Sequence, residues 1–362
     1  MLRYLIMIVF VLSGCTDRTF APVVPSALEV GTNQNIFVGT TRKETPAGAF
    51  GIERSQQLKL LEVQISIPPG HAFGEISHGL EDPKPLRDFV IAQRSDFQTP
   101  AAFRDALNRE LNQIDAQDRE VTVFVHGFNN SFADSVFRTA QMAHDLRLPG
   151  SFVTYAWPSR GNPLGYQYDA DSALFARDGL QELLYDVQRA GTNRIVLVAH
   201  SMGSTVLMET LRQIEIARPG WTSDNIAGVV LLSPDLNVDV FRAQVSAFEK
   251  LPQPFMVFVS QRDIVLKLSA FLRGEEVQLG NLNSTKRLDD LPVQVIDVSA
   301  FEDRQSAGHF VTAGSPALGA LLSNLGRLDP DFISGGTGAS LSLPGTRRVY
   351  GDATEITVRP PT

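Results

Sequence analysis

The strongest constraint on the fold is an alternation of strand-like apolar runs with helix-length amphipathic segments along the middle of the chain. The runs that we expect to form buried strands are 121–125, 152–156, 195–198, 226–232, 255–259 and 293–298. The segments between them carry apolar residues at spacings of three and four, which is typical of helices that cover a sheet. Strands joined by such helices are parallel and buried on both faces. The pattern therefore predicts an α/β fold with a mostly parallel sheet between two layers of helices.

The first residues form a secretory signal. A short positive start, Met1–Arg3, precedes nine apolar residues, Tyr4–Leu12, which are too few to span a bilayer. The small residues Ser13 and Gly14 follow, and then the only cysteine, Cys15, so the segment resembles a bacterial lipoprotein signal. The resemblance implies that residues 1–14 are removed and that Cys15 is lipidated. The alternative is an ordinary secretory signal with a chance cysteine, and Thr16 favours the outer membrane if the host is Gram-negative.

The composition of the remaining chain predicts its segment boundaries and excludes several kinds of partner and site. Residues 15–34 are predicted to be a tether, 35–328 the folded domain with extra strands such as 60–67 at one sheet edge, and 329–362 a disordered tail. The formal charge of −8 argues against a nucleic-acid partner. One cysteine also excludes an internal disulfide and any zinc or iron–sulfur site built from several thiolates.

Ser201 is the candidate nucleophile. A buried strand at 194–198 runs into Ala199-His200-Ser201-Met202-Gly203 and then into an amphipathic helix. This strand–turn–helix context is that of a nucleophile elbow, in which small residues flank an exposed serine on a strained turn. The alternative is a serine that only caps the helix.

The candidate base and acid follow Ser201 in the chain, as they do in folds with this elbow. Of the six histidines only His309 comes after Ser201, and a solvated surface histidine is the alternative. Two carboxylates end later strands and could orient an imidazole. We favour Asp263, at the end of the later strand, over Asp235, which could instead be a turn or helix-capping residue.

Two backbone N–H groups are expected to form the oxyanion hole. One belongs to Met202, immediately after the nucleophile. The other is assigned to Phe128, in the loop His126-Gly127-Phe128-Asn129-Asn130 that follows strand 121–125. The glycine would let this loop approach the substrate, and the asparagine side chains would hold it.

Trp157 and Arg160 are candidate pocket residues because they follow a strand that ends on the same side as Ser201. Trp157 could wall an acyl or aromatic group, and Arg160 could bind a carboxylate or phosphate. Structural roles are equally plausible, with Arg160 paired to Asp169 or Asp171. Only about 20 residues separate Asp235 from the next strand, too few for a large lid, which favours short-chain esters; residues 264–292 could form a small flap.

With these residues in place, the chain resembles a bacterial α/β-hydrolase family of esterase/lipase type long listed as a domain of unknown function. The resemblance spans roughly residues 35–328. The segments that carry it are Phe37–Arg42, His126–Asn129, Trp157–Gly161 with Tyr166 and Asp169, Ala199–Gly203, Ser233–Asp235, Ser260–Asp263 and Gly308-His309. It implies a serine hydrolase of esterase type with a poorly defined substrate.

The leading hypothesis is therefore a membrane-tethered serine esterase. Ser201 would attack a small-molecule ester, His309 would transfer the proton and Asp263 would orient His309, with no metal or organic cofactor. The expected partners are the ester and, through Cys15, a membrane of the cell envelope; no protein partner is predicted. A lipase, thioesterase or acyltransferase with the same triad remains open, as does a catalytically silent lipoprotein that uses the fold for binding.

Overall fold

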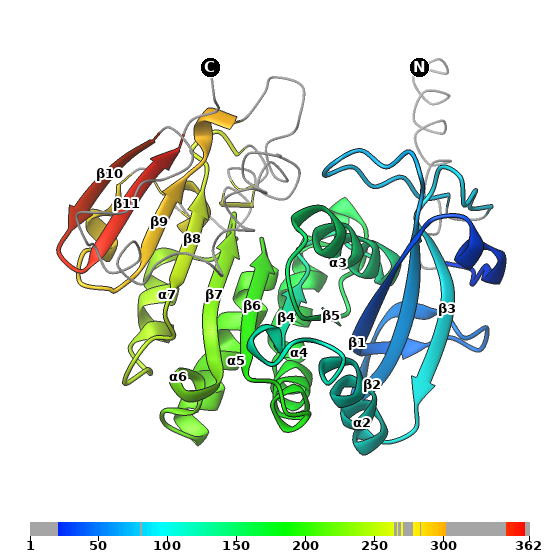
Figure 1. Ribbon diagram of the computed structural model, residues 1–362. Coiled ribbons are helices and arrows are strands. Elements are labelled where there is room, and N and C mark those ends of the chain that lie inside the picture. Colours follow the sequence, from blue (N-terminus) through cyan, green and yellow to red (C-terminus); the bar gives the residue numbers. More distant parts are fainter. Residues whose placement is uncertain are drawn as a thin grey trace, which may run out of the picture.

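A computed structural model describes residues 21–79, 82–263, 266, 269–270, 278–282, 284–301 and 345–358. In these ranges the strands form one sheet in the order β10-β11-β9-β8-β7-β6-β4-β5-β1-β2-β3 (Figure 1). The strands are β1 (Thr32–Glu44), β2 (Phe50–Ile67), β3 (Val90–Phe97), β4 (Glu120–Val125), β5 (Ser151–Ala156), β6 (Arg194–His200), β7 (Ile226–Leu232), β8 (Phe255–Val259), β9 (Gln294–Asp297), β10 (Gly345–Tyr350) and β11 (Ala353–Val358).

The sheet is parallel from β11 to β1 and antiparallel at its two ends. The parallel pairs run without interruption through β9, β8, β7, β6, β4 and β5. β2 pairs antiparallel with β1 and β3, which confirms the extra strands expected at the N-terminal edge. β10 pairs antiparallel with β11 at the opposite end (Figure 1). The predicted α/β architecture is therefore confirmed.

Six α-helices and several 3₁₀ turns connect the strands in the described ranges. The α-helices are α2 (Pro100–Leu111), α3 (Phe132–Leu146), α4 (Tyr166–Arg189), α5 (Gly203–Ala217), α6 (Trp221–Asn225) and α7 (Val238–Val245). The 3₁₀ turns are η1 (Pro25–Glu29), η2 (Ala116–Asp118), η3 (Pro163–Gly165), η4 (Leu279–Asn281), η5 (Thr285–Leu288) and η6 (Ser299–Phe301). None of the helices in this part of the chain combines the length and apolar character that crossing a membrane requires.

Local sequence accounts for where these helices begin. Thr99 caps α2, since its side chain accepts a hydrogen bond from Ala102 N at 3.2 Å. α3 begins with a capping box in which Ser131 and Asp134 satisfy each other's backbone N–H groups. This box fixes the helix directly after the loop predicted to carry the oxyanion hole.

The helices cover both faces of the sheet because strand side chains alternate between them. On β4, Val121, Val123 and Val125 belong to the core that includes side chains of α2, α4, α5 and α7. Phe124 points the other way and packs with Met142 of α3. The expected burial of the sheet on two sides is thus met in the described residues.

Both expected chain ends need correction. The tail predicted to be disordered contains β10 and β11, and β11 pairs in parallel with β9 from Thr354 to Thr357. The tether predicted for 15–34 includes η1, where Ala27 is buried, and Val24, whose N–H donates to Ile91 O at 2.9 Å. Short extended segments at each end are ordered by pairing with the sheet, an effect that composition does not register. Residues 1–20, 302–344 and 359–362, with Cys15 and His309, lie outside the described residues.

Candidate active site

Ser201 lies on a sharp turn between β6 and α5. Its φ is +52°, a left-handed conformation that is strained for a residue with a side chain. The turn is held by its backbone: Ser201 N–H donates to Leu232 O at 2.9 Å, and Ser201 O accepts from Asp235 N at 3.1 Å. These features are those of the predicted nucleophile elbow.

Gly203 allows α5 to begin against the loop that follows β4. A Cβ atom at this position would lie 2.3 Å from His126 O and 2.5 Å from Val125 O. No side chain fits there without moving backbone. The requirement for a small residue two positions after the serine is therefore a packing requirement in this chain.

Gly127 brings the predicted oxyanion loop beside Ser201. A Cβ atom on Gly127 would lie 2.9 Å from Ser201 Cβ and 2.7 Å from His200 Nδ1. The backbone next to Phe128 therefore runs within contact distance of Ser201. The use of the Phe128 and Met202 N–H groups as oxyanion donors stays a prediction, and this proximity is what it requires.

Asn130 and Asp169 hold this loop. Asn130 Nδ2 donates to Gly127 O at 3.2 Å and to Phe128 O at 2.8 Å, which is the side-chain support predicted for Asn130. Asn129 has φ +60°, and its N–H donates to Asp169 Oδ2 at 3.3 Å. The loop is thus fixed by α4, which carries Asp169, as well as by its own side chain.

Asp169 is a fully buried carboxylate that joins two loops. Besides Asn129 N, it accepts Ser159 Oγ at 2.5 Å and Arg160 N at 2.6 Å. Burial raises the pKa of Asp169, whereas these hydrogen bonds and the charge of Arg42 lower it. The loop after β5 and the loop after β4 are therefore tied to one anion.

Arg42 supplies a buried cation next to the same loops. Its guanidinium donates to Ser159 O at 3.0 Å, to Asn130 O at 2.8 Å and to Gly51 O at 3.1 Å. Burial lowers the pKa of Arg42 to about 10, although Asp169 acts in the opposite direction. It stays charged at neutral pH. Sequence analysis named Arg42 only as part of a pattern and Asp169 as a possible partner of Arg160. No local signal assigns Arg42 a buried role, because it begins the charged run Arg42-Lys43-Glu44 at the end of β1.

Trp157 lies inside the described part of the molecule, packed against the loop that follows β4. Its side chain is fully buried, its ring stacks on His126 with centroids 4.9 Å apart, and Nε1 donates to His126 O at 2.7 Å. Its role is structural, because it holds the residue that precedes Gly127. Burial lowers the pKa of His126 to about 3, so this imidazole is neutral.

Arg160 is exposed, and its guanidinium lies 5.8 Å from the centre of the Tyr168 ring. The expected link to Asp169 exists, but it is made by the backbone N–H of Arg160 rather than by its guanidinium. A role of that side chain in binding an anionic substrate stays a prediction.

Both candidate acids are buried after the strands that were predicted to carry them. Asp263 follows β8, and its Oδ1 accepts Leu266 N at 3.0 Å. Asp235 follows β7 and accepts Tyr166 Oη and Ser269 Oγ, each at 2.8 Å. A carboxylate oxygen has room for more than one donor, so neither set of contacts removes a candidate. The choice of acid and the position of His309 stay predictions.

Tyr166, at the start of α4, connects the Asp235 side of the site to the oxyanion loop. Its hydroxyl donates to Asp235, and its ring packs edge-on against Phe128 with centroids 5.3 Å apart. Sequence analysis gave Tyr166 no role of its own. We expect it to fix the orientation of both groups.

Comparison with known proteins identifies the class to which this fold and site belong. Residues 99–325 match the model of the family described as alpha/beta hydrolase of unknown function (DUF900), and the chain belongs to that family. Among solved structures, the chain is similar to Trichoderma reesei cutinase in complex with a C11Y4 phosphonate inhibitor. That match has 16% identity, covers 38% of this chain and 66% of the cutinase chain, and has a TM-score of 0.23. No curated protein matches.

Proposed function

We propose that the protein is a serine hydrolase that cleaves carboxylic esters through an acyl-enzyme on Ser201. The observation that carries the proposal is the elbow itself: a non-glycine residue at φ +52° whose Cβ lies beside the Gly127 loop. Strain of this kind is kept where it positions a reactive group. Membership of the alpha/beta hydrolase family agrees with it.

In the proposed reaction, Ser201 Oγ forms a bond to the ester carbonyl carbon while His309 takes the hydroxyl proton. The C–O bond of the ester then breaks, and His309 returns the proton to the departing alcohol. A water molecule then attacks the carbonyl carbon of the acyl-enzyme while His309 takes its proton. The bond to Ser201 Oγ breaks, His309 returns the proton to Ser201, and the carboxylic acid is released. Asp263, or Asp235 in its place, orients His309, and the Phe128 and Met202 N–H groups stabilise the oxyanion.

The first test is hydrolysis of a series of p-nitrophenyl esters of increasing acyl length by the full-length chain. Ser201→Ala and His309→Ala should each lose at least about a thousandfold in kcat. The control is Ser246→Ala, which removes an exposed hydroxyl that bonds only to Ala243 O in its own helix. Full activity in Ser201→Ala would overturn the proposal.

A parallel comparison identifies the acid. We expect Asp263→Ala to lose far more kcat than Asp235→Ala. The opposite order would assign the role to Asp235. The acyl-length series with wild type, extended to thioesters and to alcohol acceptors, separates an esterase from a lipase, a thioesterase or an acyltransferase with the same triad.

We further propose that Cys15 anchors the enzyme to a bacterial envelope membrane. The support is the order of charge, apolar run and small residues before the only cysteine. Mass spectrometry of the mature N-terminus should find a multiply acylated Cys15, and Cys15→Ser should release the protein from the membrane fraction. An unmodified Cys15 in the mature chain would contradict the anchor and leave the hydrolase proposal intact.

A further inference from the structure

A cluster of two histidines and one aspartate lies where the loop after β2 meets the last turn of α3. His71 comes from the loop, and His144 and Asp145 come from the helix. His71 Nε2 is 2.6 Å from Asp145 Oδ1, and both side chains are more than nine-tenths buried. One ligand atom from each of the three residues lies within 4.8 Å of the others, and no other set of three His, Cys, Asp or Glu side chains in the described ranges meets that condition.

The carboxylate of Asp145 is oriented by outer hydrogen bonds. Its Oδ2 accepts Gly74 N at 2.7 Å and Gln141 Nε2 at 2.6 Å, and Gln141 Oε1 in turn accepts Arg138 at 2.7 Å. These bonds leave Oδ1 directed at His71. Metal ligands in proteins are commonly fixed in this way by groups that do not touch the metal.

Both imidazoles are placed side by side. The ring of His71 packs edge-on against Phe89 at 5.2 Å and against His144 at 5.5 Å between centroids. Burial lowers the pKa of His144, and His71 and Arg147 act in the same direction, while Asp145 opposes them. His144 is therefore neutral near pH 7, the form in which an imidazole binds a metal.

We propose that His71, His144 and Asp145 form a binding site for a divalent transition-metal ion of the Zn²⁺ class. Two imidazole nitrogens and one carboxylate oxygen suit Zn²⁺, and water would complete a tetrahedral set. Coordination breaks the hydrogen bond between His71 Nε2 and Asp145 Oδ1. The Nε2 proton leaves to solvent and His71 Nδ1 takes one up, so the metal-bound imidazole stays neutral. The positive charges of Arg138 and Arg147 oppose the cation, so micromolar rather than tighter affinity is expected.

The site would fasten the loop to the helix rather than take part in ester cleavage. α3 has 15 residues, so His144 lies about 20 Å along the helix from its N-terminus, where the Gly127 loop ends. Sequence reasoning could not find such a site, because His71 and His144 are far apart in the chain. The expectation that no metal is needed for catalysis is unaffected.

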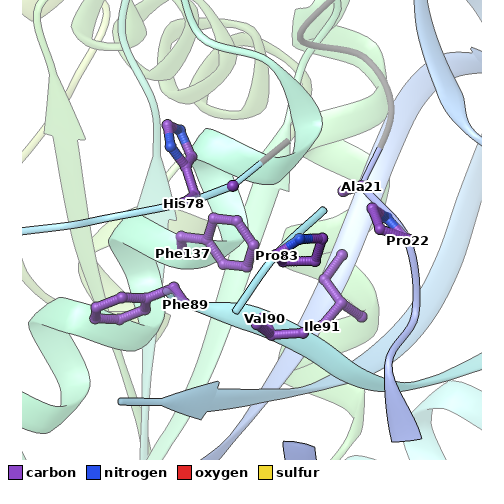
Figure 2. A pocket seen from close by; sticks show the side chains of 9 residues that line it. Ala21, Pro22, His78, Pro83, Phe89, Val90, Ile91 and Phe137 are labelled. Atoms are coloured by element: carbon purple, nitrogen blue, oxygen red, sulfur yellow. The ribbon is translucent and has the colours of Figure 1, made fainter. Parts of the chain in front are cut away.

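A second histidine–aspartate pair on the same loop and helix provides a matched control. His78 Nε2 is 2.9 Å from Asp134 Oδ1, and its ring lies beside Phe137 with centroids 5.9 Å apart. Figure 2 shows His78 and Phe137 at the edge of a cavity of about 10 Å³, room for about one water molecule. This pair belongs to no three-ligand set in the described residues.

The test is competition between the metal-free full-length chain and a chromophoric chelator for Zn²⁺. His144→Gln should weaken the affinity at least tenfold while leaving the His71–Asp145 hydrogen bond in place, and His78→Gln should bind like wild type. Cys15 and His309 are present in every variant, so metal bound by them does not change the comparison. Equal Zn²⁺ affinity in wild type and His144→Gln, or no binding by wild type at micromolar Zn²⁺, would overturn the proposal.

Two further readouts separate a metal site from a structural hydrogen bond. Co²⁺ should give wild type a visible d–d absorption band that His144→Gln lacks. Zn²⁺ should raise the Tm of wild type and of His78→Gln but leave that of His144→Gln unchanged, because only binding to the folded state stabilises. A Tm rise of the same size in His144→Gln would contradict the assignment. Ester hydrolysis is not a readout here, so failure of this proposal and failure of the hydrolase proposal are distinguishable.

Discussion

The backbone of Ser201 is left-handed, a conformation that serine disfavours and that the sharp turn between β6 and α5 requires. A left-handed residue with a Cβ costs about 1–2 kcal/mol relative to glycine, and the contacts of the elbow must offset that cost. Gly127 and Gly203 contribute by leaving out side chains where two backbones meet. At the scale of single residues, the site therefore depends on one strained serine and on two glycines that let the neighbouring backbones approach it.

Two replacements of Ser201, both without the hydroxyl, measure the backbone strain at this position apart from any catalytic role. Ser201→Gly should have a free energy of unfolding about 1 kcal/mol higher than Ser201→Ala, because glycine adopts φ +52° without strain. Urea unfolding of both variants measures the difference. Equal stability would mean that the turn is not strained in solution.

Asp169 should be the most sensitive residue of the loop network. Asp169→Asn leaves one acceptor oxygen for three donors and removes the anion near Arg42, so we expect a loss of about 2–3 kcal/mol in the free energy of unfolding. Asp171→Asn, at an exposed position of the same helix, is the control and should change it by less than about 0.5 kcal/mol. Similar small effects in both variants would show that the network does not hold the loops.

Residue identity predicted the sharp turn at Ser201 but not the contacts that support it. The order of small residue, serine and glycine after a strand is local, so the sequence carries it directly. The buried roles of Arg42 and Trp157 depend on segments far away in the chain: Arg42 bonds to Asn130, 88 positions later. For the same reason the stacking of Trp157 on His126, 31 positions earlier, could not be predicted.

At the scale of elements, the alternation of apolar runs with amphipathic segments was sufficient to predict the parallel strands and the helices between them. Strands 226–232 and 255–259 have the predicted limits, since a buried parallel strand is a continuous apolar run. The C-terminal strands were missed because β10 and β11 are short and polar and follow the glycine-rich segment 335–338. β11 pairs with β9 and β10 pairs with β11, and no local sequence pattern predicts such long-range pairing.

The C-terminal pairing is tested by one buried side chain. Ile356 of β11 is 6% exposed and packs with residues of β8 and β9, so Ile356→Ala should lower the free energy of unfolding by about 2–4 kcal/mol. Val349 of β10 is 63% exposed, and Val349→Ala should have little effect. If both variants unfold like wild type, this segment does not join the sheet.

At the scale of the whole molecule, a buried neutral histidine links stability to pH. His126 has a folded pKa of about 3 against about 6.5 in an unfolded chain, so the unfolded state binds more protons between these values. The free energy of unfolding should therefore fall as pH is lowered from about 6.5, by up to about 1.4 kcal/mol per unit from His126. Asp169 acts with the opposite sign, because burial raises its pKa and the folded state therefore binds the proton more tightly than the unfolded state.

Urea unfolding between pH 7 and 5 measures this linkage. Wild type and His78→Gln should lose stability over the range, and His126→Gln should have a smaller slope. A slope in His126→Gln as large as that of wild type would assign the pH dependence to other groups.

The proposed ester hydrolysis depends on Ser201 being an activated nucleophile. The most direct measurement is intact-mass analysis of the full-length chain after reaction with a fluorophosphonate probe, for wild type and Ser201→Ala. We predict one adduct on wild type and none on Ser201→Ala. An adduct of equal yield on Ser201→Ala, or none on folded wild type, would contradict the assignment and favour a protein that uses this fold for binding alone.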